Sequence, residues 1–221
     1  ILGSNLAQGT CYEEPINSGG SGTVTGTPVS DFSTLKTNIN SAPTDGTVTE
    51  LYLTNDINMT EYLNINSGQN IVLKTNGNYS IYRGSSFTGS FFTVNSGATL
   101  TLGGSDYTIT LDGRDSSLNE VSASYPFIVV KGDFTFEKKC IMQYNTNNST
   151  SSNNIGGGIV VNSGKLTINE GIIQYCQATK GGGINVTADA EIIVNGGKIV
   201  NNAASGNGGG IAIKTATLIL D

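Results

Sequence analysis

The chain repeats a short element, three glycines followed by an isoleucine, toward its C-terminal end. The element starts at Gly156, Gly181 and Gly208, so successive copies lie 25 and 27 residues apart. A period of this length is typical of a solenoid, in which each repeat is one supersecondary unit that stacks on the next. This spacing restricts the possible folds more than any other feature of the sequence.

The first two copies align with one another beyond their glycines. A third copy follows the same course from Ile211 to Asp221, and looser echoes occur at residues 91–102 and 127–136. Because equivalent residues of a solenoid lie above one another, the alignment predicts which residues pair between repeats. The predicted pairs are Ile159 with Ile184, Ile168 with Val194, Asn169 with Asn195, Gly171 with Gly197, and Ile173 with Ile199.

From about residue 46 the sequence consists of apolar runs of three to six residues, such as "NIVLKT", "TLTL" and "EIIV", separated by turn signals such as "NSG" and "NGN". Such runs are typical of short strands. Three strands in each period of about 25 residues predict an all-β fold, a parallel β-helix of roughly seven coils over residues 46–221 that is open at its C-terminal end. Neighbouring coils would lie about 4.8 Å apart.

Each glycine triplet is expected to form a corner between two strands. A corner needs backbone angles that glycine reaches without strain, and the next coil passes close to it. A phosphate-binding glycine loop is disfavoured, because a strand rather than a helix follows each triplet. We expect Ile184 and Val186 to point inward and Asn185 outward, and the asparagines to bond the backbone or form short ladders. The predicted structural repeat residues are Gly156, Gly157, Gly158, Ile159, Gly181, Gly182, Gly183, Ile184, Gly208, Gly209, Gly210, Ile211, Asn169 and Asn195.

The N-terminal part differs from the repeats. Residues 1–29 are rich in Gly, Ser and Thr, which predicts an extension, a linker or an inter-subunit strand. Residues 30–45 predict a capping helix that starts at Ser30 or Asp31 and ends at Pro43, with Phe32, Leu35 and Ile39 on one face. We expect this helix to cover the first sheet edge; an ordinary connecting helix is the alternative.

Composition excludes several classes of function. The net charge is −6 without a basic cluster, which argues against nucleic acid and anionic membranes as partners. No apolar run approaches the ~20 residues of a membrane span, so no membrane insertion is expected. The chain has no histidine and no CxxC pair, which excludes imidazole catalysis and disfavours a metal or other cofactor. Of the three cysteines, Cys140 and Cys176 are predicted to be buried, and Cys11 is the candidate for an intermolecular disulfide.

Carboxylates provide the remaining chemistry, and they are densest in "TLDGRDSSLNE". This stretch holds Asp112, Arg114, Asp115 and Glu120. A polysaccharide-cleaving site needs paired carboxylates on one exposed face, but acidic residues do not recur at equivalent outward positions of consecutive repeats. Calcium-binding turns and threonine ladders would also need a regular spacing that is missing here. We therefore interpret the stretch as a turn with an inserted loop.

The repeats resemble those of secreted and surface-anchored microbial adhesin-like proteins with right-handed parallel β-helices, including the polymorphic outer membrane proteins. Units of the latter carry a GG-x-aliphatic element followed by FxxN. "GGGI" matches the first element, "IVNN" at 199–202 matches the second with isoleucine for phenylalanine, and "IQYC" at 173–176 departs further. The resemblance covers residues 156–221 well and 46–155 loosely.

The resemblance implies a right-handed coil and a non-catalytic structural or adhesin-like module, secreted or at the cell surface. Candidate partners are a second copy, through the coil ends or the N-terminal segment, and a glycan or protein of a host or cell surface. Because the sequence stops in mid-coil at Asp221, we expect either further coils or end-to-end assembly into a filament or stalk. The alternative function is a fragment of a polysaccharide-degrading β-helix enzyme, a lyase or glycoside hydrolase.

Overall fold

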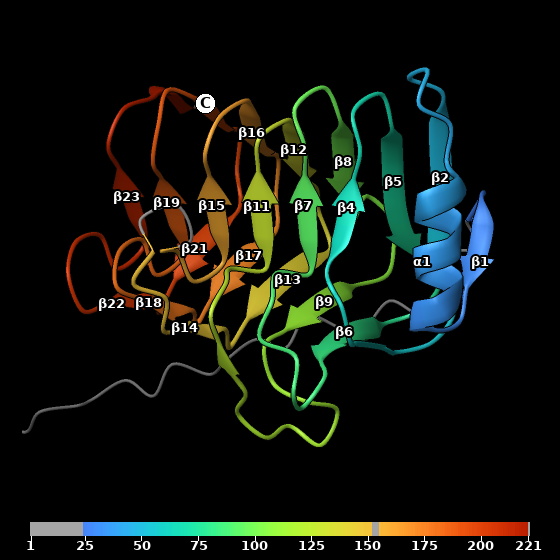
Figure 1. Ribbon diagram of the computed structural model, residues 1–221, viewed down its shortest axis with the longest axis horizontal. Helices are drawn as coiled ribbons and strands as arrows, with labels where there is room; N and C mark the ends of the chain where they lie inside the picture. Colours follow the sequence, from blue (N-terminus) through green and yellow to red (C-terminus); the bar gives the residue numbers. More distant parts are fainter. Residues whose placement is uncertain (1–23, 152–154, 221) are drawn as a thin grey trace, which may run out of the picture.

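Parallel strands wind around one axis in the computed structural model, which describes residues 24–151 and 155–220. The strands stack into a solenoid of about seven turns, which confirms the expected parallel β-helix. Figure 1 shows the coils side by side along the long horizontal axis, with α1 at one end and β23 near the other. Every pairing between two strands of the described residues is parallel.

Four sheets form the sides of the solenoid within the described residues. Sheet A contains β1 (Thr27–Val29), β2 (Val48–Leu53), β5 (Asn70–Thr75), β8 (Thr99–Leu102), β12 (Asp133–Phe136), β16 (Lys165–Ile168), β20 (Glu191–Val194) and β24 (Thr217–Leu220). Sheet B contains β3 (Ile57–Met59), β6 (Tyr79–Arg83), β9 (Ile109–Asp112), β13 (Cys140–Gln143), β17 (Ile172–Gln174) and β21 (Lys198–Val200). Sheet C contains β4 (Leu63–Ile65), β7 (Phe92–Val94), β11 (Ile128–Val130), β15 (Ile159–Val161), β19 (Ile184–Val186) and β23 (Ile211–Ile213). The short sheet contains β10 (Ser122–Ala123), β14 (Thr146–Asn147), β18 (Gln177–Ala178) and β22 (Ala203–Ala204).

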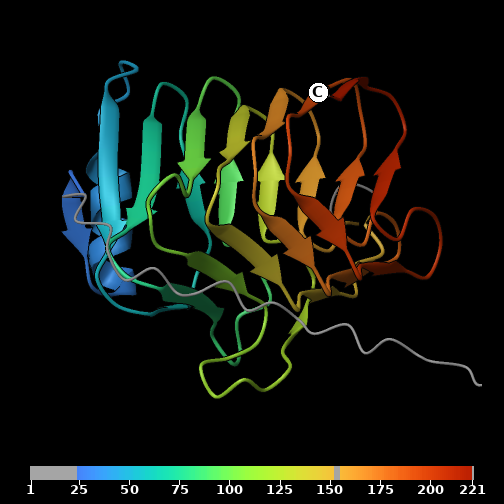
Figure 2. The same ribbon diagram turned by 180° about the vertical axis from the view of Figure 1, so that it is seen from behind.

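Each coil visits the sheets in the same order. From β2 onward the chain passes through sheets A, B and C, and from the third coil a strand of the short sheet lies between B and C. Sheet C faces the viewer in Figure 1, and Figure 2 shows sheet A from behind. Because side chains of a strand alternate between its two faces, every sheet has one face in the core and one on the outside.

The register places the aligned residues of the repeats next to one another. Ile159 pairs with Ile184, Ile168 with Val194, and Ile173 with Ile199. Earlier coils vary more in length, from 22 residues between the paired Leu51 and Leu73 to 34 residues between the paired Leu102 and Phe136. Insertions at the corners therefore explain why the repeat is weak before residue 156.

Inward side chains stack in columns along the axis. In sheet A, Leu73 pairs with Leu102, which pairs with Phe136, and all three side chains are fully buried. Full burial of such a side chain contributes about 1.5–3 kcal/mol. The columns form one continuous core, so each coil depends on its neighbours for stability.

The N-terminal end is covered by α1 (Phe32–Ser41). Oδ1 of Asp31 accepts a hydrogen bond from the backbone N–H of Thr34 at 2.7 Å, which makes Asp31 the N-cap. Leu35 and Ile39 are fully buried, and the helix packs against β1, β3 and β4. Nε2 of Gln69 donates to the carbonyl oxygens of Ile39 and Ala42, so a coil side chain satisfies the end of the helix.

Sheet A starts before the expected boundary at residue 46. β1 lies at the end of the segment expected to be an extension, and it pairs with β2 of the same chain, Thr27 opposite Leu51. Val29 is buried, whereas Pro28, which lacks a backbone N–H, sits in a strand at the edge of the sheet. In the part of the chain that the structure describes, no helix combines the length and apolar character needed to cross a membrane.

Candidate functional site

The glycine triplets form corners at which consecutive coils touch. Gly181 and Gly208 have positive φ angles of 57° and 68°, which a residue with a Cβ adopts only with strain. Gly182 has ordinary angles, but a Cβ there would collide with the carbonyl oxygens of Ala203 and Gly209. The backbone N–H of Gly183 donates to the carbonyl oxygen of Gly210 at 2.9 Å. The triplets therefore serve coil stacking, and their N–H groups in the first two copies point at the next coil.

Asparagine side chains link coils at two other corners. Nδ2 of Asn195 donates to Oδ1 of Asn169 at 2.7 Å, and Nδ2 of Asn169 donates to Oε1 of Glu137 at 2.7 Å. At the corner after sheet B, Oδ1 of Asn202 accepts from the backbone N–H of Cys176 at 2.9 Å. These contacts hold neighbouring coils together.

Asp112 forms an ion pair with Arg114 on the outside of sheet B. Its carboxylate is 2% exposed and accepts from Nε and Nη2 of Arg114 at 2.9 and 2.7 Å. Nε2 of Gln143 on the next coil donates to Oδ2 at 2.9 Å. The Arg114 guanidinium lies 3.9 Å from the ring centre of Tyr144, which stacks on Tyr175. The Asp112 carboxylate is thus paired with Arg114 and covered from solvent.

Asp115 organises the inserted loop. Its Oδ2 accepts from Nδ2 of Asn119 at 3.0 Å, and its Oδ1 accepts from the backbone N–H groups of Asn119 and Ser117, both at 2.9 Å. These hydrogen bonds lower the pKa of the carboxyl group, the one from the Asn119 side chain most. Arg114 and Glu120 form an antiparallel bridge that closes the loop. Asp112 and Asp115 therefore have separate partners. In the described residues, no group of three or more acidic or cysteine side chains could hold a metal ion.

Arg83 is a buried charge that the sequence pattern does not single out. Nη1 donates to the carbonyl oxygens of Phe87 and Gly89, and Nη2 donates to Oδ1 of Asn145 at 2.9 Å. The rings of Phe87, Phe91 and Phe127 lie within 6 Å of the guanidinium. Burial lowers the pKa of Arg83 to about 10. Because its Nη donors are used by the protein itself, Arg83 anchors the loop after β6.

The two described cysteines lie in the core. Cys140 and Cys176 are free and buried, as their sequence surroundings predict. Burial raises the pKa of the Cys140 thiol well above its ordinary value and that of Cys176 to about 12. Cys11 lies outside the described residues.

The outer face of sheet C carries a hollow near the C-terminal coils. The outward side chains follow the register Thr93, Val129, Val160, Asn185 and Ala212. The segment at 155–158 packs on this face, because a Cβ on Gly156 would lie 2.6 Å from Cγ2 of Val160. On the C-terminal side of this segment lies a groove of about 560 Å³, which we call the sheet C groove. Its lining includes Ile155, Lys180, Asn185, Thr187, Asn207, Ala212 and Lys214.

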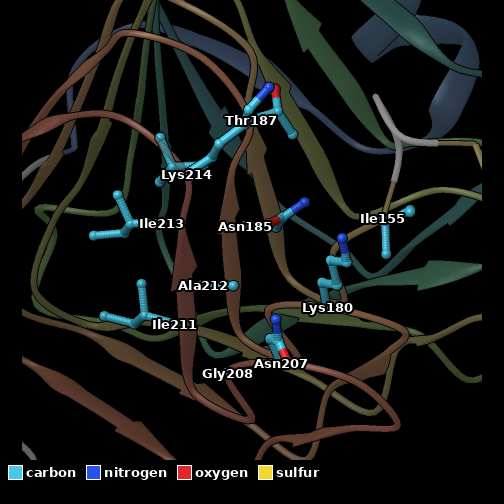
Figure 3. A pocket seen from close by; sticks show the side chains of 11 residues that line it. Ile155, Lys180, Asn185, Thr187, Asn207, Gly208, Ile211, Ala212, Ile213 and Lys214 are labelled. Carbon is cyan, nitrogen blue, oxygen red and sulfur yellow. The ribbon is translucent and has the colours of Figure 1, made fainter.

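The sheet C groove is positively charged in an acidic protein. Lys180 and Lys214 line it, no Asp or Glu does, and neither lysine forms an ion pair within the described residues. Figure 3 shows the side chains of Lys180 and Asn185 extending into the same space on one side of β23. Asn185 is only 6% exposed, although it is one of the outward residues. The groove therefore offers ammonium and amide donors above paired strands of sheet C.

A smaller hollow lies on the other side of the segment at 155–158. It has a volume of about 320 Å³, and Lys131 is its charged residue. Sequence reasoning missed both hollows, although one signal was present. Val129 and Val160 occupy outward positions, and continuous apolar strands such as "IVV" are typical of sheets buried on both faces.

Comparisons with protein-family models, curated proteins and solved structures find no match to this chain.

Proposed function

We propose that the chain is a non-catalytic β-helix module of the secreted or cell-surface, adhesin-like kind, as its repeats suggest. The observation that carries this proposal is the sheet C groove, a donor-rich hollow without carboxylates in its lining, on the outer face of a parallel sheet. In such a module the stacked coils supply stiffness, and outward side chains supply the contacts with a partner. Recognition sites of this kind are usually largely preformed.

The surroundings of the acidic cluster support a non-catalytic role. Hydrolysis of a glycosidic bond uses two carboxyl groups that flank one bond, one of them as acid and the other as base or nucleophile. Asp112 is held by Arg114 and Gln143, whereas Asp115 is held by its own loop. Neither carboxylate lines the sheet C groove.

Self-association is the second part of the proposal, and the N-terminal end limits how it can occur. Since α1 packs against β3 and β4, a copy that stacks end to end would have to displace the helix from sheets B and C. Sheet A offers β1 as its edge. Sedimentation velocity over a range of concentrations tests this: a single species at every concentration would contradict end-to-end assembly.

The binding function is tested on the purified chain with arrays of glycans and surface proteins, together with a polysaccharide panel assayed for new reducing ends. We expect saturable binding without product release. Turnover that disappears in Asp112→Asn and Asp115→Asn would establish the enzyme alternative.

The extracellular location is tested separately: antibodies against the chain should label intact source cells or the secreted fraction. Labelling only after permeabilisation would contradict an extracellular location.

A further inference from the structure

We propose that the sheet C groove binds a short acidic sugar chain. Its carboxylates would contact the ammonium groups of Lys180 and Lys214, and its hydroxyl groups would contact the amides of Asn185 and Asn207. The proposal rests on the function proposed above, because it names the class of partner for that module.

Charge is the first argument. The whole chain carries a net charge of −6, so an anion is repelled from most of its surface. The sheet C groove is an exception, since two lysines line it and none of its lining residues is acidic. A carboxylate that enters the groove therefore finds two cations that no described residue neutralises.

Asn185 is the second argument. Its residue is 94% buried, it lines the groove, and its side-chain amide has no hydrogen-bond partner among the described residues. The amide atoms of Asn185 are not fully enclosed by the protein, so a ligand can reach them from the groove. Because the amide offers both a donor and an acceptor, a sugar hydroxyl group satisfies it well.

The floor of the groove favours a sugar over an extended peptide. β19 pairs with β15 on one side and with β23 on the other, so its backbone groups are already used in the sheet. A peptide that binds by strand addition would have to pair with β23, the edge strand of sheet C beside the groove, and not with the floor. A sugar chain binds through side-chain hydrogen bonds, and the apolar side chains of Ile155 and Ala212 provide a surface for its C–H groups.

The test is calorimetric titration of the chain with tetragalacturonate, with a neutral galactose tetramer and tetraglutamate as comparison ligands. We expect tetragalacturonate to bind more tightly than the other two ligands, and we expect its affinity to fall as salt is added. Lys180→Met and Lys214→Met should each weaken binding about tenfold or more, as expected for loss of a charge-assisted hydrogen bond. Lys198→Met is the matched control, because Lys198 is an exposed lysine of sheet B, and it should leave binding unchanged.

A second pair of variants leaves the charges in place. Asn185→Leu removes the amide, and Ala212→Phe fills the groove; both should weaken binding, with folding checked by circular dichroism. The proposal is overturned if tetragalacturonate does not bind, or if the neutral tetramer binds equally well or tetraglutamate binds more tightly. It is also overturned if the groove variants bind tetragalacturonate as well as the unchanged chain does. If these variants still bind a surface ligand found on the arrays, the inference fails while the module function stands.

Discussion

Asn195 and Asn169 lie one above the other on consecutive coils, and Nδ2 of Asn195 donates to Oδ1 of Asn169 at 2.7 Å. Nδ2 of Asn169 in turn donates to Oε1 of Glu137, so side chains outside the core join three coils. Each residue directly follows a strand of sheet A. The ladder therefore fixes the register of the corner between sheets A and B.

Replacement of Asn169 should break both links of this ladder. Asn169→Ala is expected to lower the free energy of unfolding by about 1–2 kcal/mol, because a partly exposed hydrogen bond contributes about 0.5–1.5 kcal/mol. Asn195→Ala removes only the terminal link and should cost about half as much. Urea denaturation measures both values, and equal losses would contradict a ladder that is centred on Asn169.

The third glycines of the repeats allow a matched comparison. A Cβ on Gly183 would lie 2.7 Å from the carbonyl oxygen of Gly210, whereas a Cβ on Gly210 has no neighbour closer than 3.6 Å. Neither residue has a positive φ angle. Gly183→Ala should therefore destabilise the chain by about 1–3 kcal/mol through overpacking, and Gly210→Ala should be nearly neutral. Similar losses of thermal stability in the two variants would contradict close coil stacking as the reason for the glycines.

Asp112 is expected to contribute to stability. Asp112→Asn keeps the shape but leaves Arg114 without its anionic partner, so the free energy of unfolding should fall by about 2–3 kcal/mol. Asp115→Asn serves as the comparison, because Asp115 is partly exposed and its hydrogen bonds stay within one loop. Guanidinium denaturation of both variants tests this; a larger loss for the Asp115 variant would contradict the assignment.

Arg83 should be irreplaceable by another cation. Arg83→Lys retains the positive charge, yet a single ammonium group lacks the planar fork that reaches Gly89 and Asn145 together. We expect a loss of about 2–4 kcal/mol for this variant, since each unsatisfied buried acceptor costs about 1–3 kcal/mol. Arg114→Lys is the control at a partly exposed site. If Arg83→Lys were as stable as the unchanged chain, the hydrogen bonds of the fork would not anchor the loop.

The fold could be predicted because the spacing of the repeat gives the length of each coil and therefore the pairing between coils. Coils of nearly constant length bring Ile159 over Ile184 and Ile173 over Ile199, so spacing alone gives the register. The first coil was harder, since β1 is short and lies next to a Gly/Ser/Thr-rich stretch. The sheet C groove was not predictable from spacing. It depends on a corner segment that folds back over Val160, and this packing is a tertiary contact that no local pattern encodes.

The buried thiols should make the chain less stable in alkali. Cys140 and Cys176 keep their protons in the folded chain because burial raises their pKa values, that of Cys176 to about 12. In the unfolded chain a thiol ionises near pH ~8.5. Between these values the unfolded state binds fewer protons, so stability is fully present below pH ~8.5 and declines above it. The decline is about 1.4 kcal/mol per pH unit for each thiol. Urea denaturation from pH 7 to 10.5 should show this slope, and Cys140→Ala with Cys176→Ala should remove it. An unchanged slope in the double variant would assign the alkaline loss to other groups.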